Sequence, residues 1–195
     1  MSGFTTLTGK IAVLNQDDVD TDRIIPARFL SMVTKSGYGE LAFKDVRGPD
    51  FPLDRPEASG AEILVVGTNF GCGSSREHAV WAIQQAGYKA VVANKTAESP
   101  GFSDIFRSNA GNCGLALIEL GEDDHSKLVA QGSGAIASID LPKQTVSWPG
   151  GNASFEIAPA TKSQLIEGLD LIGITLRHKD EIDAFERASK AYVPK

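Results

Sequence analysis

Cysteine is scarce in this chain, and its scarcity excludes two kinds of structure. Cys72 and Cys113 are the only cysteines among the 195 residues. In a cytosolic chain we expect no disulfide between them, because that compartment keeps thiols reduced. An iron–sulfur cluster usually takes about four thiolates, so two cysteines are too few for this chain to hold a cluster alone.

Long apolar runs and an excess of positive charge are missing as well. No apolar run reaches the roughly 18 residues that a membrane-spanning helix needs. The net charge of -6 argues against a nucleic-acid binder or a membrane-surface binder. The first residues lack the basic and apolar regions of a signal peptide, so we expect a cytoplasmic protein. The hydrophobic content of 42% is typical of a globular chain, and we expect residues 1–195 to form one domain.

The hydrophobic pattern predicts a layered α/β domain whose parallel core joins an antiparallel portion. Over residues 62–95 the expected order is strand, loop, helix, strand, with Gly87 ending the helix. Such a βαβ unit should be parallel and right-handed. Buried strands are predicted at 10–14, 63–67, 89–93 and 115–118, and alternating strands at 135–140, 144–148 and 154–158. Further helices are predicted from Ser99, with Phe102, Ile105 and Phe106 on one face, from the acids at 122–124, and at 161–168 and 179–190.

Residues 31–60 differ from the rest because they are rich in glycine, proline and charge and show no periodicity. Long segments of this kind are uncommon in compact domains and are often functional. We therefore expect a long, partly mobile loop at about 31–60.

The most informative stretch is residues 69–78 (NFGCGSSREH), between a predicted strand and a predicted helix. Glycines 71 and 73 allow a tight turn and a close approach by a ligand. Ser74 or Ser75 can cap the helix, whose first N–H groups then form an anion site. Arg76 adds a guanidinium suited to a carboxylate or a phosphate. The sequence therefore predicts a substrate-contacting loop.

Several generic motifs fail at this loop. Arg76 stands where the dinucleotide-binding pattern needs its last glycine, and the lysine of a P-loop is missing. Ser74 lacks the flanking glycines of a nucleophile elbow. A serine–histidine pair with His78 remains an alternative, although a histidine four residues along a helix more often packs locally. Cys72 is expected to be a small buried filler rather than a reactive thiol, and Cys113 likewise.

Four aspartates within residues 17–22 allow either a metal site or a turn-forming loop with aspartate caps. They lack the spacing of a calcium-binding loop, and we favour the turn for most of them. At the central loop, a hydroxyl among N–H donors beside an arginine suits proton abstraction from carbon with an anionic substrate. A plain anion-binding loop would have the same pattern.

Residues 69–79 (NFGCGSSREHA) resemble the signature of the swivelling domain of the aconitase superfamily. Within it they are similar to the small-subunit family of bacterial 3-isopropylmalate dehydratases. Three further stretches match that family in order: 19–30 (VDTDRIIPARFL), 102–106 (FSDIF) and 168–176 (GLDLIGITL). The resemblance therefore covers nearly the whole chain.

The resemblance implies a three-layer β/β/α swivelling domain that closes over a separate large subunit carrying a [4Fe–4S] cluster. It assigns Ser74 as the base that takes a proton from the substrate carbon. Ser75 and Arg76 would bind a substrate carboxylate, and Arg28 would match a second substrate-binding arginine. Asp22 would pair with a catalytic histidine of the partner.

The implied reaction interconverts 2-isopropylmalate and 3-isopropylmalate by dehydration and rehydration, in leucine biosynthesis. Cluster iron would act as the Lewis acid on the departing hydroxyl. Related two-subunit enzymes that act on homocitrate or on methylated malates share the central motif, and residues 31–45 are where we expect the substrate's alkyl group to be sensed. An anion-binding module and an inactive paralogue are the non-enzymatic alternatives.

Overall fold

A computed structural model describes residues 3–32, 34–74 and 76–188 of the chain. Its strands are β1 (Thr6–Leu14), β2 (Ile63–Val66), β3 (Ala90–Lys95), β4 (Ala116–Gly121), β5 (Ile136–Asp140), β6 (Thr145–Trp148) and β7 (Gly151–Ser154). Its helices are α1 (Thr21–Ile24), α2 (Glu77–Gln85), α3 (Asp104–Cys113), α4 (Glu122–Val129), α5 (Pro159–Glu167), α6 (Leu171–Leu176) and α7 (Lys179–Ala188). Short 3-10 turns lie at Ala27–Phe29, Gly39–Leu41, Pro52–Asp54 and Pro56–Ala58.

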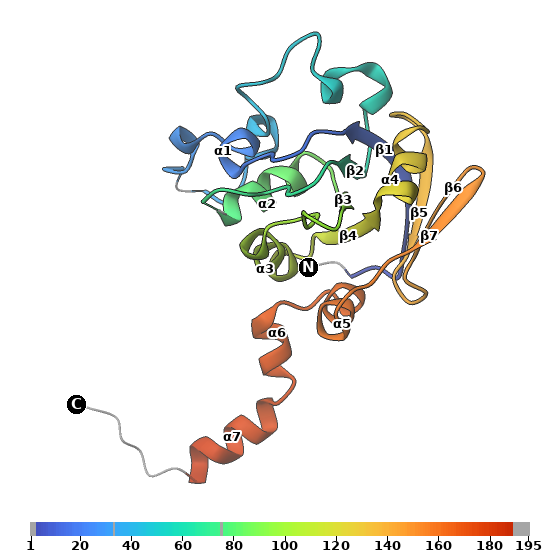
Figure 1. The fold of residues 1–195 in the computed structure, drawn as a ribbon. Helices are drawn as coiled ribbons and strands as arrows, with labels where there is room; N and C mark the ends of the chain where they lie inside the picture. Colours follow the sequence, from blue (N-terminus) through green and yellow to red (C-terminus); the bar gives the residue numbers. More distant parts are fainter. Residues whose placement is uncertain (1–2, 33, 75, 189–195) are drawn as a thin grey trace.

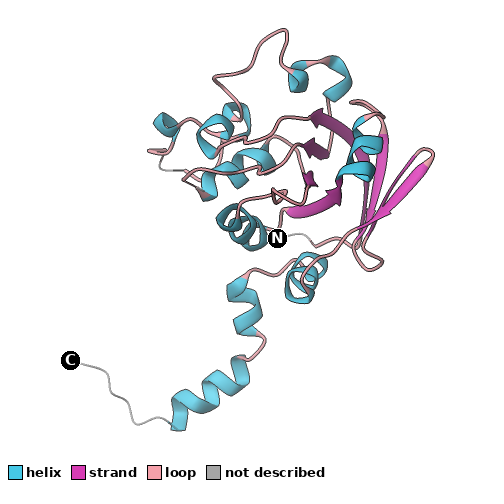
Figure 2. Cartoon of the chain, viewed as in Figure 1, coloured by secondary structure: helices cyan, strands magenta, loops and turns pink. Residues whose placement is uncertain are grey.

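The seven strands form one sheet in the order β4-β3-β2-β1-β5-β6-β7. The strands are the magenta arrows in Figure 2. Strands β1 to β4 are parallel, and β5 to β7 continue the sheet antiparallel. Strand β1 belongs to both parts, because residues 11–14 pair with β2 and residues 6–10 pair with β5. The predicted βαβ unit is confirmed, since β2 and β3 are parallel neighbours joined through α2.

Two apolar cores lie on opposite faces of the parallel strands. Alternate residues such as Leu64 and Val66 face a core shared with α2, α3 and residues 19–61. Ile63 and Val65 face a second core, which the antiparallel strands, α4 and α5 close. This alternation follows from the two-residue period of a strand. The result is a helical layer, a parallel layer and an antiparallel layer, which confirms the predicted α/β class with β/β/α layering (Figure 1).

Two predicted elements have different bounds in the structure. Helix α3 begins at Asp104 rather than near Ser99, because the carbonyls of Pro100 and Gly101 accept hydrogen bonds from the loop after β2. Ile105 does not share the buried face of Phe106, since Ile105 is 58% exposed. The last strand is residues 151–154 and not 154–158, because a tight turn at Pro149 and Gly150, with φ +85° at Gly150, closes the β6–β7 hairpin early.

The segment 31–60 lacks strands and α-helices in its described residues, but it contributes to the helical-side core. Tyr38 and Phe43 are fully buried there. Its mobility stays a prediction. In the described part of the chain, no helix is long and apolar enough to cross a membrane.

Candidate active site

The candidate site lies at the carboxyl edge of the parallel strands, where segments following β1, β2 and β3 meet. In open α/β sheets this edge is the usual ligand-binding side. The loop after β2, residues 67–76, lies between residues 15–22, which follow β1, and residues 96–103, which follow β3. The predicted substrate-contacting loop is therefore flanked on both sides by other chain segments.

Backbone hydrogen bonds fix the loop on both flanks. On the β1 side, the amide of Gly71 donates to the carbonyl of Val19 at 2.8 Å, and the amide of Thr21 donates to the carbonyl of Cys72 at 3.0 Å. On the β3 side, the amide of Phe70 donates to the carbonyl of Gly101 at 2.9 Å. The loop thus continues strand-like pairing beyond the end of the sheet.

Gly71 shows why the loop needs glycine. Its φ is +77°, and a Cβ added there would lie 2.3 Å from Cγ of Phe106. The left-handed backbone and the close aromatic ring both exclude a side chain. The hydroxyl of Ser103 donates to the Gly71 carbonyl at 2.7 Å and ties the turn to the start of α3.

Helix α1 brings two of its side chains to the two functional groups of the loop. The hydroxyls of Thr21 and Ser74 are 3.4 Å apart. One position further along, Asp22 forms an ion pair with the guanidinium of Arg76. Three of the predicted site residues, Ser74, Arg76 and Asp22, therefore lie together, with Thr21 as their neighbour. Ser74 is exposed and Thr21 is fully buried.

Helix capping differs from the prediction. The N-cap residue of α2 is Arg76, and its side chain makes no capping hydrogen bond. Of the two serines predicted to be able to cap the helix, Ser74 precedes the N-cap by two residues and contacts Thr21 instead. Ser75 lies outside the described residues.

Arg28 has a different partner from the other predicted site residues. It pairs with Asp45, and its guanidinium lies 4.5 Å from the centre of the Phe29 ring. The hydrogen bond that Arg28 donates to Asp45 raises the pKa of Arg28 and outweighs the opposing effect of desolvation. About half of each side chain in the pair is exposed, at 55% and 49%. Any contact of Arg28 with the Ser74 cluster would require its release from Asp45.

The neighbouring aspartates accept hydrogen bonds within and between the segments of the site, as the turn interpretation predicted. Asp17 accepts a hydrogen bond from the amide of Thr68 at 2.6 Å, and Asp20 caps α1 by accepting from the amide of Arg23 at 2.7 Å. Asp18, with φ +52°, accepts from the Asn69 side chain at 2.7 Å. Asp17 and Asp18 therefore hold the two segments of the site together, whereas Asp20 stabilises the start of α1.

The alternative nucleophiles are in unfavourable surroundings. The His78 ring packs against Tyr38 at 5.5 Å and Trp81 at 4.7 Å between centroids, which confirms local packing. Burial, followed by the charges of Asp20 and Asp18, raises the pKa of the Cys72 thiol. Burial and a hydrogen bond with Glu77 raise the pKa of Cys113 to about 11. Both cysteines are free thiols, and a raised pKa disfavours the reactive thiolate.

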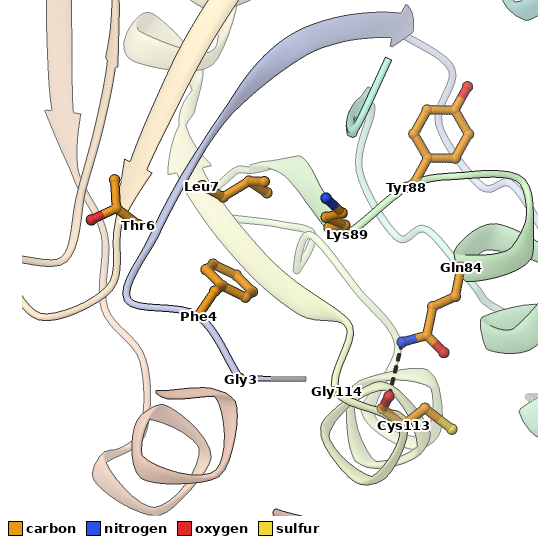
Figure 3. A pocket seen from close by; sticks show the side chains of 9 residues that line it. All are labelled: Gly3, Phe4, Thr6, Leu7, Gln84, Tyr88, Lys89, Cys113 and Gly114. Carbon is orange, nitrogen blue, oxygen red and sulfur yellow. Dashed lines mark hydrogen bonds between the residues drawn. The ribbon is translucent and has the colours of Figure 1, made fainter. Parts of the chain in front are cut away.

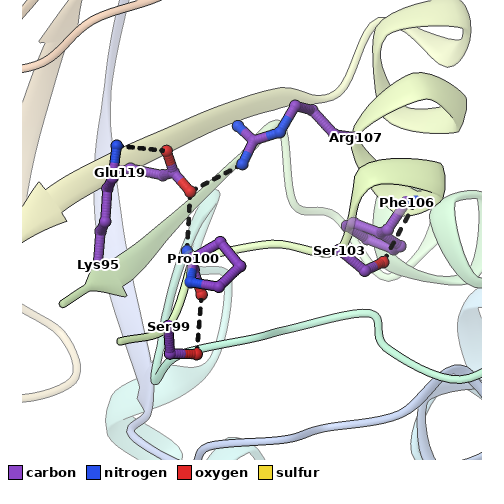
Figure 4. A network of polar contacts seen from close by, with 8 residues as sticks. Lys95, Ser99, Pro100, Ser103, Phe106, Arg107 and Glu119 are labelled. Carbon is purple, nitrogen blue, oxygen red and sulfur yellow. Dashed lines mark hydrogen bonds and ion pairs between the residues drawn. The ribbon is translucent and has the colours of Figure 1, made fainter. Parts of the chain in front are cut away.

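Glu119, on strand β4, bonds to residues that flank the substrate-contacting loop (Figure 4). One of its carboxylate oxygens accepts from the amide of Gly101 and from the guanidinium of Arg107, both at 2.8 Å. Burial acts to raise the pKa of Glu119, but the hydrogen bond and charge of Arg107 outweigh it and lower the pKa. Because Gly101 pairs with Phe70, this carboxylate stabilises the flank of the substrate-contacting loop.

A separate pocket of about 410 Å³ is lined by residues from the far end of α2 (Figure 3). Gln84 and Tyr88 line it, together with Cys113 at the end of α3 and Phe4 before β1. The candidate loop precedes the first residue of α2, whereas this pocket lies at the last turn, so the pocket is not part of the candidate site.

Sequence reasoning missed the proximity of Thr21 to Ser74. The two residues are 53 positions apart, and no local pattern links them. The available signal was indirect: Thr21 stands between two aspartates in a stretch that matches the same family as the central loop.

Comparisons with known proteins identify the family of this chain. The aconitase C-terminal domain model matches residues 1–123, and the model for the C-terminal domain of the 3-isopropylmalate dehydratase small subunit matches residues 172–194. A solved 3-isopropylmalate dehydratase chain (LeuD) from Methanocaldococcus jannaschii superposes with a TM-score of 0.67 at 30% identity, covering 93% of this chain and 99% of that one.

Full-length relatives carry one description. The 3-isopropylmalate dehydratase small subunits of Rubrobacter xylanophilus and Paramagnetospirillum magneticum are 42% and 44% identical, each over 100% of this chain and 99% of the relative. That of Roseiflexus castenholzii is 46% identical over 96% of this chain and 95% of its own length. By sequence and by fold, this chain belongs to the 3-isopropylmalate dehydratase small-subunit family of the aconitase superfamily.

Proposed function

We propose that this chain is the small subunit of a two-subunit hydro-lyase that interconverts 2-isopropylmalate and 3-isopropylmalate in leucine biosynthesis. The family membership supports the activity and implies a large-subunit partner. The observation that carries the role of this chain is the pairing of one loop with α1: Ser74 meets Thr21, and Arg76 meets Asp22, at the ligand-binding edge of the sheet.

In this proposal Arg76 binds the substrate and Ser74 transfers the proton. The guanidinium of Arg76, together with Ser75, binds a carboxylate of the substrate, and the ion pair with Asp22 orients that guanidinium. The deprotonated Ser74 oxygen takes a proton from the substrate carbon, and the electron pair of the broken C–H bond forms the alkene; Ser74 returns a proton to carbon when water adds back. The hydroxyl of the neighbouring carbon leaves in the same dehydration, and water adds back with the opposite orientation, so the overall composition is unchanged.

We assign the [4Fe–4S] cluster to the large subunit. The donor set of this chain does not fit a cluster, because its two cysteines are fewer than the usual four or so thiolates. The residues of this chain would therefore contribute proton transfer and carboxylate binding only. Asp22 would additionally meet a histidine of the partner.

The substrate and the compartment are also part of the proposal. We place recognition of the alkyl group in residues 31–45, supported by the contact of this segment with the start of the helix after the loop: the rings of Tyr38 and His78 lie 5.5 Å apart between centroids. Arg28 would join the site as the second carboxylate-binding arginine after leaving Asp45. The two free thiols agree with a cytoplasmic location.

The test is a turnover assay of the chain with its large subunit, using a panel of 2-alkylmalates and homocitrate. We expect 2-isopropylmalate to be preferred and Ser74→Ala to lower kcat by at least about 1,000-fold while subunit assembly is kept. Ser126→Ala, an exposed serine on α4, is the matched control and should leave kcat unchanged. Turnover by this chain alone, or near-normal turnover of Ser74→Ala, would contradict the proposal.

A further inference from the structure

We infer that Thr21 is a positioning residue, which holds the Ser74 hydroxyl in place and stabilises its deprotonated form by donating a hydrogen bond. This inference rests on the proposed role of Ser74 as the base. Thr21 touches neither substrate nor partner in this account, and it acts through Ser74.

The first argument is the fixed placement of Thr21. It is completely buried, at 0% exposure, although its side chain is polar. Its amide donates to the Cys72 carbonyl at 3.0 Å, and its carbonyl accepts from the amide of Ile25 at 2.9 Å. A β-branched side chain is also stiff at χ1, and threonine in a helix is largely confined to two rotamers, so its hydroxyl oxygen has few accessible positions.

The second argument is the mobility that the loop would have without this contact. Gly73 precedes Ser74 with φ +84°, and a Cβ at that glycine would lie 3.7 Å from the Thr21 hydroxyl. Ser74 itself is exposed, and its neighbour on the buried side is Thr21. An exposed serine samples several rotamers unless a partner selects one. Thr21 is that partner, and its own position is fixed by the backbone hydrogen bonds of α1.

The third argument is the chemistry of a serine base. A hydroxyl carries one proton and two lone pairs, so two neutral hydroxyls can exchange donor and acceptor roles. Once Ser74 is deprotonated, only Thr21 can donate in this pair, and a bond to an anion is stronger and shorter than a neutral one. The present distance of 3.4 Å is long. Catalytic hydrogen bonds in ligand-free sites often shorten when the substrate binds.

The experiment compares Thr21→Val with Thr21→Ser in the complex with the large subunit. Valine keeps the branched shape and removes the hydroxyl, whereas serine keeps the hydroxyl and removes the methyl group. For Thr21→Val we expect kcat to fall about 10- to 100-fold with little change in KM, because Arg76 is untouched. Thr21→Ser should stay within about threefold of wild type.

The pH profile separates positioning from a structural role. Without the donor the pKa of Ser74 rises, so the acid limb of kcat should move to higher pH in Thr21→Val and stay in place in Thr21→Ser. Equal losses in the two variants, or wild-type kcat in Thr21→Val, would overturn the inference. If Thr21→Val does not assemble with the large subunit, Thr21→Ser decides the test. Impaired turnover of Thr21→Ser would then overturn the inference, whereas near-wild-type turnover with an unshifted acid limb of the pH profile would support it.

A Ser74→Ala background distinguishes failure of this inference from failure of the proposed function. With Ser74 absent, Thr21→Val should cause no additional loss. If Ser74→Ala keeps its turnover, the assigned base is wrong, and the role of Thr21 fails with it. If Ser74→Ala is inactive while Thr21→Val has normal kcat and an unshifted profile, the proposed function stands and only the positioning role is refuted.

Discussion

Residues 3–168, here called the body, and residues 169–188, the C-terminal arm, are organised by different forces. The body has two cores with many fully buried side chains. In the arm, neither α6 nor α7 has a buried residue, and the arm extends away from the body (Figure 1). Among the described residues, the arm contains four exposed large hydrophobic side chains: Leu171, Ile172, Leu176 and Phe185.

Helix formation in the arm depends on local signals. Asp170 caps α6 by accepting from the amide of Gly173 at 2.6 Å, and Lys179 pairs with Asp183 one turn away at 2.8 Å. Such contacts stabilise a helix by a few tenths to about 1 kcal/mol each. In the body, burial of apolar surface contributes more to stability than such local contacts do. Local signals therefore specify a helix, while only burial specifies where it packs.

The largest effect is expected from Phe106→Ala in the body. Phe106 is fully buried, with its ring 5.6 Å from Phe70 and 6.3 Å from Phe102 between centroids. Removal of the ring leaves a cavity under the Gly71 turn and should lower the free energy of unfolding by about 3–5 kcal/mol. Urea denaturation of the isolated chain measures this. A loss below about 1 kcal/mol would mean that the body is not held together by this core.

An intermediate effect is expected from Glu119→Gln, which keeps the shape of the side chain but removes its charge. Weaker bonds to Gly101 and Arg107 should lower the free energy of unfolding by about 1 kcal/mol at neutral pH. The matched control Lys95→Gln removes a partner 3.8 Å away that is 59% exposed, and it should change stability by less than about 0.5 kcal/mol.

The pH dependence of this difference has a definite sign. The folded-state pKa of Glu119 is lowered, so its contribution is present above the ordinary glutamate value of about 4.3. The contribution is lost as pH falls from that value through the lower folded-state pKa. Denaturation of wild type and Glu119→Gln at a series of pH values should show the difference shrinking below about pH 4. A difference that grows toward acid would contradict the assignment.

The smallest effect is expected from Phe185→Ala in the arm, the matched counterpart of Phe106→Ala. Phe185 is 73% exposed, so its truncation should change the free energy of unfolding of the isolated chain by less than about 0.5 kcal/mol. The same urea series measures it. A loss approaching that of Phe106→Ala would show that the arm packs on the body and would remove the contrast between them.

Sequence reasoning succeeded where local pattern and burial coincide. The apolar run at Ile63–Val66 predicted a buried strand, and the acids at 122–124 predicted the start of α4, because each signal acts within a few residues. It failed at the last strand, where the tight turn at Pro149 and Gly150 ends the hairpin early, and at Ser99, where distant pairing decides. Pro100 and Gly101 bond to residues 69 and 70, a use of their carbonyls that no helical periodicity reveals.

The sequence named the candidate site residues but not the contacts between them. The resemblance named Ser74, Arg76 and Asp22, and the structure brings those three together. The pairing of Arg28 with Asp45 and the contact between Thr21 and Ser74 depend on segments 17 and 53 residues apart. Their partners are selected by tertiary packing, which a single sequence does not encode in any short window.

The double membership of β1 has a consequence for synthesis and folding. Thr8 of this first strand is bonded to Ser138, 130 residues later. A growing chain therefore makes β1 early and must leave its first half unpaired until β5 emerges, with an open strand edge in the meantime. Such long-range closure slows folding and ties the two halves of the sheet into one cooperative unit. Cleavage of the chain between β4 and β5 would thus leave two fragments that each need the other to fold.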